Sequence, residues 1–159
     1  MILFTAIFLI IDICSKIIIS KYLELNQSIR VIKNFLNITY VRNTGVAWSI
    51  LNNQSIVVII LSSIVTIAII LYIKNNKPTN TLEKLSYSLI LGGAIGNLIE
   101  RIIHGYVTDF IDINLFGYNY PIFNMADTFI VIGVILIIIT TWRCKHDRNE
   151  SNKQRKHKD

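Results

Sequence analysis

The sequence predicts a mainly α membrane protein with four transmembrane helices and a small β-sheet region on the outer, extracytoplasmic face. Its 159 residues are 52% hydrophobic and 16% charged, with a mean hydropathy of +0.50. Soluble domains usually carry about a quarter charged residues. Four segments approach the length of about 20 residues that is needed to cross a bilayer. They are residues 2–20, 56–73, 85–103 and 125–142.

The first two spans differ in polarity. Residues 2–20 contain Asp12 and Lys16 and lack both a basic start and a small-residue cleavage site, so we expect a retained helix and not a cleaved signal peptide. Residues 56–73 carry no charge and are the plainest span. Between these spans, the run FLNITYVRN alternates its side chains with a period of two and is rich in β-branched and aromatic residues. It predicts a β region over about residues 29–43.

The distribution of positive charge predicts the orientation. Residues 74–84 are basic, and seven Lys and Arg fall in the last seventeen residues, whereas residues 104–124 contain none. Because Lys and Arg gather on the cytoplasmic side, we expect both termini in the cytoplasm and residues 21–55 and 104–124 outside. The chain then divides into a membrane domain, 1–145, and a basic cytoplasmic tail, 146–159. Such a tail is typical of contact with anionic lipid, not with nucleic acid.

Two carboxylates are expected at the same membrane depth. Asp109 follows the third span and Asp127 lies in the first turn of the fourth, which puts both near the outer interface. Two carboxyl groups held close together in a low-dielectric site can divide the roles of base for a water and acid for a carbonyl. The plain alternatives are a loop or capping acid at Asp109 and a helix N-cap at Asp127. Asp112, in the same loop, is interpreted as a solvated acid without a partner.

The third span carries polar residues that an anchor does not need. Gly92 and Gly96 form a small-xxx-small pair that lets another helix approach closely. Asn97 and Arg101 lie one turn apart on the same face, and packing explains neither. Arg101 can alternatively extend to the interface, with Glu100 compensating its charge.

Two further groups of polar residues have both a structural and a functional interpretation. Asp12 and Lys16 are one turn apart in the first span and can form a structural ion pair, brace the active region or contact a polar substrate group. Asn43, Thr44 and Gly45 form a turn-like patch on the outer side, where Asn43 can also bind a peptide backbone.

No metal site is predicted. Cys14 and Cys144 are expected at different depths, where a disulfide cannot join them, and neither has ligand spacing. His104 is interpreted as a plain loop residue.

Four motifs in order, VRNTGVAW, GGAIGNLIER, VTDFID and FNMAD, resemble those of lipoprotein signal peptidase (signal peptidase II). The resemblance extends from Asp12 to Asp127. This family consists of bacterial inner-membrane aspartic peptidases that remove the signal peptide of prolipoproteins.

The resemblance implies roles for individual residues. The family's catalytic dyad corresponds to Asp109 and Asp127. The supporting polar positions of the family correspond to Asp12, Lys16, Asn43, Gly45, Asn97, Arg101 and Asn124. The family usually has Asp where this chain has Glu100.

The resemblance also implies a substrate, a prolipoprotein with a diacylglyceryl-modified Cys immediately after the scissile bond. Asn97 and Asn124 would hold the peptide backbone, Arg101 a lipid carbonyl or the peptide, and Trp48 would rest at headgroup level. The implied enzyme works as a monomer among membrane lipids of the bacterial cytoplasmic membrane. Its chemistry needs no metal or other cofactor.

Two other classes of function compete with this interpretation. A proton-coupled transporter or ion pathway would also place charged residues in spans, but transporters usually show internal repeats and polar groups near the midplane. A structural subunit would give no reason for polar residues to gather at one depth.

Overall fold

The computed structural model describes residues 1–45 and 54–156, with side chains as far as Trp142. Within these residues the chain forms four helices and four strands. The helices are α1 (Ile2–Tyr22), α2 (Ser55–Asn75), α3 (Thr81–His104) and α4 (Met125–Lys156), and the strands are β1 (Ser28–Ile32), β2 (Leu36–Asn43), β3 (Val107–Leu115) and β4 (Tyr118–Asn119). The mainly helical fold with a small sheet agrees with the prediction.

Three helices have the length and composition of membrane spans. They are α1, α2 and the Met125–Trp142 part of α4, with mean hydropathies of 2.5, 3.0 and 2.2. The fourth predicted span, α3, is longer, at 24 residues, but more polar. It packs against α1, α2 and α4 and buries Ser86, Ser88 and Asn97 against them, so its surface does not need to be apolar. Membrane crossing by α3 remains a prediction.

Close packing of α3 on α1 depends on two glycines. A Cβ atom at Gly92 would lie 2.9 Å from Cβ of Phe8, and one at Gly96 would overlap the carboxylate of Asp12. The prediction that this pair lets another helix approach is confirmed, and the partner is α1. The short separation allows polar groups of α1 to reach those of α3.

Packing of α3 on α4 depends on Gly93, and we expect Gly93→Ala to destabilise the fold by about 1–3 kcal/mol. A Cβ atom there would overlap the backbone carbonyl of Ala126, which cannot rotate away. The measurement is unfolding in detergent micelles. Val65→Ile adds a methylene on the exposed face of α2, where Val65 is 55% exposed, and should change unfolding little. Equal losses in both variants would contradict the argument.

The last helix is longer than the predicted span. We expected a boundary at residue 145 and a separate tail after it, but α4 continues as helix to Lys156. The basic segment therefore begins as an extension of the helix, and its cytoplasmic location remains a prediction.

The sheet is antiparallel, with the strand order β1-β2-β3-β4. The predicted β region is confirmed as β1 and β2. Residues 107–115, which we expected to be a loop, form β3 instead, because they pair along β2 from Asn43 opposite Val107 to Leu36 opposite Ile113. The first dyad candidate, Asp109, thus lies in a strand, opposite Val41.

The interpretation of Asp112 as a solvated acid without a partner is wrong. It is half-buried in β3, and its Oδ2 accepts hydrogen bonds from Oγ1 of Thr39 at 2.8 Å and Nδ2 of Asn37 at 3.4 Å. The β2–β3 register, which the sequence did not reveal, supplies both partners.

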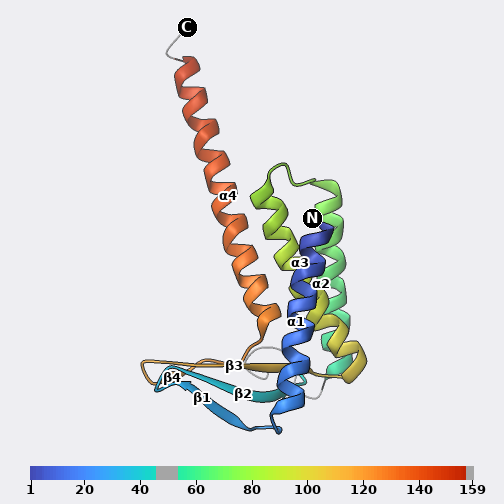
Figure 1. Ribbon diagram of the computed structural model, residues 1–159. Helices are drawn as coiled ribbons and strands as arrows, with labels where there is room; N and C mark the ends of the chain where they lie inside the picture. The colour runs from blue at the N-terminus through green and yellow to red at the C-terminus, as the bar shows by residue number, and fades with distance from the viewer. Residues whose placement is uncertain (46–53, 157–159) are drawn as a thin grey trace.

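The sheet lies across one end of the helices (Figure 1). The start of α1, the connection from α2 to α3 and the C-terminal part of α4 lie toward the opposite end. The three segments predicted to face the cytoplasm are therefore on the same side of the molecule, away from the sheet.

Candidate active site

Asn124 connects the two predicted dyad residues. Asp109 is buried in β3, and Asp127 is half-buried in the first turn of α4. The Nδ2 of Asn124 donates to Oδ1 of Asp109 at 2.6 Å. Its backbone N–H points to Oδ2 of Asp127 at 3.3 Å. One buried asparagine therefore holds carboxylates from a strand and a helix beside each other.

Asn124 is also the N-cap of α4. Its Oδ1 accepts from the backbone N–H of Asp127 at 3.1 Å, while Asp127 Oδ2 accepts from the backbone N–H of Asn124. This reciprocal pattern is a capping box. Asp127 therefore takes part in capping the helix, but as the third helical residue and not as the N-cap, and this contact uses one carboxylate oxygen. The other oxygen faces α3.

That second oxygen is held by Asn97. The Nδ2 of Asn97 donates to Oδ1 of Asp127 at 2.8 Å, and the Oδ1 of Asn97 accepts from Nζ of Lys16 at 2.7 Å. Because the ammonium group can only donate, it fixes which way the amide of Asn97 points. The NH₂ group of Asn97 is therefore directed at Asp127.

Lys16 is the centre of a buried charge cluster. Its Nζ lies 2.8 Å from Oδ2 of Asp12 and 3.2 Å from Oε2 of Glu100. We had interpreted Glu100 as compensating Arg101, whereas the structure pairs it with Lys16. The second oxygen of Asp12 accepts from the backbone N–H of Ala126 at 2.9 Å. Asp12 thereby ties α1 to the first turn of α4, which agrees with the bracing interpretation.

The turn after β2 supports Asp109 from its other side. The Nδ2 of Asn43 donates to Oδ2 of Asp109 at 2.9 Å, and its Oδ1 accepts from the backbone N–H of Gly45 at 2.9 Å. The predicted turn is therefore present. The Nη2 of Arg101 donates to the carbonyl oxygen of Gly45 at 3.1 Å, a contact that the sequence did not suggest. This contact directs the guanidinium group of Arg101 to the turn after β2.

Burial changes the acidity of Asp109. Loss of solvent raises the pKa of its carboxyl group to about 7, and the charge of Asp127 acts in the same direction. Hydrogen bonds from Asn43 and Asn124 oppose the shift. A carboxyl group that gains and loses its proton near neutral pH, next to a second carboxylate, is suited to general acid–base chemistry.

Three other residues discussed in the sequence analysis, His104, Trp48 and Cys144, do not contribute to this cluster in the part of the chain that the structure describes. His104, expected in a loop, is the last residue of α3 and stacks on Tyr106 at a centroid distance of 5.6 Å. Trp48 lies outside the described residues, and so does the side chain of Cys144.

Two solved structures share the fold and define the class of protein. Both are described as bacterial membrane enzymes determined by the in meso method. One, at 2.3 Å resolution, has a TM-score of 0.83 and 40% identity, and the match covers 92% of this chain and 89% of that one. The other, at 1.9 Å, has a TM-score of 0.78 and 42% identity over 88% and 90%. The fold is therefore that of bacterial membrane enzymes.

The sequence comparisons are more specific. A family model described as signal peptidase (SPase) II matches residues 4–143. Lipoprotein signal peptidases of Staphylococcus aureus strains bovine RF122 / ET3-1 and Newman are 42% identical over 146 residues, which cover 91% of this chain and 90% of each relative. The chain belongs to the signal peptidase II family, whose members are membrane peptidases. The resemblance in the four motifs is confirmed.

Proposed function

We propose that this chain is an intramembrane aspartic endopeptidase that removes the signal peptide from diacylglyceryl-modified prolipoproteins. It cuts on the N-terminal side of the lipid-modified Cys. The observation that carries the proposal is the pair of carboxylates, Asp109 and Asp127, which are both bound by Asn124 in a chain of the signal peptidase II family.

The two carboxyl groups share one proton in the proposed mechanism. The ionised group takes a proton from a water molecule, whose oxygen attacks the scissile carbonyl carbon, while the neutral group donates its proton to the carbonyl oxygen. The carbon–nitrogen bond of this tetrahedral intermediate then breaks. The amine of the departing Cys takes a proton from the dyad, while one hydroxyl of the intermediate returns its proton to the dyad, which again holds one shared proton. Since close carboxylates titrate as a pair, the shared proton is assigned to the dyad and not to one Asp.

The neighbouring side chains receive roles from their contacts. The amides of Asn97 and Asn124 already bind the carboxylates, so we assign them to orienting the dyad in place of the expected role in holding peptide backbone. Arg101 is a better candidate than these amides for contacting the substrate. Within the described chain its buried Nε has no hydrogen-bond partner, and a lipid carbonyl or peptide carbonyl would satisfy it.

The proposed membrane arrangement has four spans, both termini in the cytoplasm and the dyad near the outer leaflet of the bacterial cytoplasmic membrane. The positive-inside rule supports it, since the basic residues 74–84 and the basic C-terminal segment both lie toward the end of the helices opposite the sheet. A lipid-anchored Cys would hold the scissile bond at the interface, level with Asp109. We propose that the chain acts as a monomer surrounded by membrane lipids.

The test is cleavage of a diacylglyceryl-modified prolipoprotein by the purified chain in proteoliposomes, with the same precursor without the lipid as the comparison. We expect a new N-terminus at the modified Cys, detected by mass spectrometry, and little cleavage of the unmodified precursor. A precursor that stays intact in both reactions would exclude the peptidase. That result would instead favour the transporter alternative, although the family membership does not support it.

The pH dependence should depend on Asp109. We expect the cleavage rate to fall as the pH rises above about 7, because the pKa of the Asp109 carboxyl group is raised to about 7 and the dyad then loses its shared proton. The hydrogen bond from Asn43 favours the ionised form, so Asn43→Ala should move this limb to higher pH. The measurement is kcat across the neutral range.

The matched control for this variant is Asn37→Ala. Asn37 lies on the same strand and donates to Asp112 in place of Asp109, so its loss should leave the limb where it was. A limb that stays fixed in Asn43→Ala, or moves to lower pH, would show that Asp109 does not set it.

A further inference from the structure

The end of the β3–β4 hairpin presents large apolar side chains with nothing from the described chain covering them. Phe116, at the tip, is 105% exposed, and its neighbours Leu115 and Tyr118 are 38% and 55% exposed. A soluble protein rarely leaves a group of this kind in water. The tip is therefore open to a partner other than the residues that the structure describes.

The tip is firmly built. Phe116 and Gly117 have φ angles of 52° and 86°, a left-handed pair that suits a two-residue hairpin turn but that bulky residues rarely adopt. The side chain of Asn114 accepts from the backbone N–H of Gly117 at 3.0 Å and donates to Oδ1 of Asn119 at 2.5 Å. A phenylalanine kept in this unfavourable conformation suggests a function for its ring.

The sequence on both sides of the tip carries no charged residue from position 113 to position 126. These residues run through the hairpin and into the first turn of α4. They lead directly to the lipid-length part of α4, where Val131 is 56% exposed. The apolar surface of that helix thus continues without a charged residue along the chain onto the hairpin. Tyr118 and Tyr120 add aromatic rings in edge contact at 5.3 Å, and aromatic residues are enriched at membrane interfaces.

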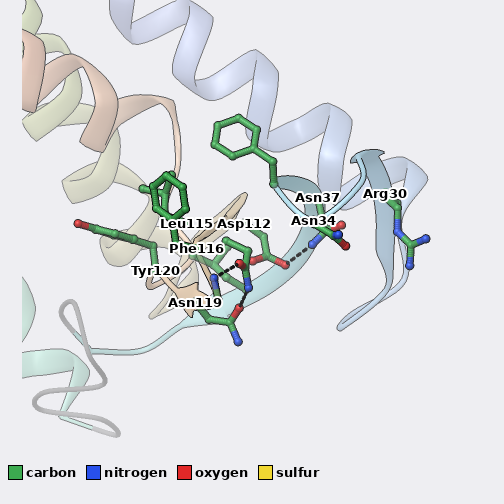
Figure 2. Close-up of a pocket in the computed structure, with 12 residues that line it drawn as sticks. Arg30, Asn34, Asn37, Asp112, Leu115, Phe116, Asn119 and Tyr120 are labelled. Atoms are coloured by element: carbon green, nitrogen blue, oxygen red, sulfur yellow. Dashed lines mark hydrogen bonds between the residues drawn. The ribbon is translucent and has the colours of Figure 1, made fainter.

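The direction of the ring agrees with a membrane partner. Figure 2 shows Phe116 at the end of the hairpin with its ring on the side of the strands on which the helices stand. A groove of about 1100 Å³ lies there. It is lined by the apolar side chains of Phe35, Leu115, Phe116 and Ile122 together with polar and charged ones that include Arg30 and Asp112. The sheet lies across the end of the helices (Figure 1), so this side faces the membrane in the arrangement proposed above.

We propose that the tip of the β3–β4 hairpin inserts into the outer leaflet, with Phe116 at the boundary between headgroups and acyl chains. Acyl chains contact the apolar side chains of the groove beneath the sheet, and lipid headgroups contact its polar ones. The hairpin then anchors β3, the strand that carries Asp109, to the surface from which the substrate's lipid enters. The inference uses the membrane orientation of the proposed function but not its chemistry.

The test measures depth directly. A nitroxide is attached at position 116 through Phe116→Cys, in a full-length chain whose two native cysteines are replaced by serine, and the protein is placed in phosphatidylglycerol–phosphatidylethanolamine vesicles. Oxygen partitions into lipid, and a water-soluble nickel complex stays outside. We expect a ratio of oxygen to nickel collision rates several-fold higher at 116 than at Lys33→Cys, an exposed position in the adjacent β1–β2 turn.

A label at Val131→Cys on α4 serves as the reference for lipid. If the nickel complex reaches the label at position 116 as readily as the label at position 33, while the label at position 131 stays protected, the insertion is overturned and the membrane spans are unaffected. Nickel access at all three positions overturns the orientation itself. A second measurement keeps an aromatic ring at position 116. In Phe116→Trp, with both native tryptophans replaced by phenylalanine, brominated lipids should quench the tryptophan fluorescence. Absence of quenching contradicts the proposal, and cleavage of the precursor, assayed separately, tests the proposed function.

Discussion

Asp109→Asn and Asp127→Asn should each lower kcat for cleavage of the lipid-modified precursor at least about a hundredfold, the size of a general acid–base contribution. Asparagine has the size of aspartate. Its amide oxygen can still accept from the side chain of Asn124 at position 109 and from the backbone N–H of Asn124 at position 127, so the geometry should survive. It cannot exchange a proton with water at neutral pH. The measurement is the initial rate of cleavage at saturating precursor in proteoliposomes.

Asp112→Asn is the matched control. Asp112 is three positions further along β3 and is bound by Thr39 and Asn37, away from Asn124. Its substitution should leave the rate close to that of the unsubstituted chain. Activity retained by Asp109→Asn or Asp127→Asn would remove that residue from the chemistry, and an equal loss in Asp112→Asn would indicate damage to the sheet.

We expect Lys16→Met to destabilise the protein by about 3–5 kcal/mol, the usual cost of removing one partner of a buried ion pair. Lys16 is 4% exposed, and its ammonium group is the shared partner of Asp12, Glu100 and Asn97. Methionine fills a similar volume but leaves two carboxylates without their cation. The measurement is chemical or thermal unfolding in detergent micelles.

Two further variants test the cause of this loss. Lys21→Met removes an exposed cation from the same helix and should change stability little. The ammonium group of Lys21 lies 5.5 Å from the centroid of the Tyr22 ring and is open to solvent. Adding Glu100→Gln to Lys16→Met removes one of the unpaired carboxylates and should recover part of the loss. If the double variant is no more stable than Lys16→Met, the charge on Glu100 is not the cause.

Much of the architecture could be predicted from the sequence because lipid-length helices leave a direct signal. Residues 2–20 and 56–73 are mostly apolar. The helices α1 and α2 that they form differ from these predicted spans only at their ends. The position of a residue along such a helix gives its depth. The close placement of Asp109 and Asp127 near one end of the bundle follows from that, even though the two are eighteen positions apart.

The contacts that orient the carboxylates could not be predicted. Lys16 and Asn97 are 81 positions apart, and Asn97 and Asp127 are 30 apart. Depth alone does not say which faces of three helices meet. It also does not say which end of an amide points to which partner.

The missed strand has a different cause. In β3 four consecutive residues, Val107 to Phe110, are all buried, because the strand is covered on both faces near the helices. The alternation that identifies an exposed strand is therefore lost at that point. The later residues Ile111, Ile113 and Leu115 do alternate, and together with the Phe116–Gly117 turn they were the available signal for a hairpin.

The ion pair within α1 also bears on how the protein is made. Synthesis proceeds from the N-terminus, so α1 reaches the membrane before α3 and α4 exist. Lys16 would then be a lone charge in an apolar helix, except that Asp12 lies one turn away and contacts it at 2.8 Å. The first helix thus enters the bilayer with its own counter-ion. Asn124 and Asp127, which complete the polar cluster, arrive only with the last helix, so the newborn chain carries no assembled site until its synthesis is nearly finished.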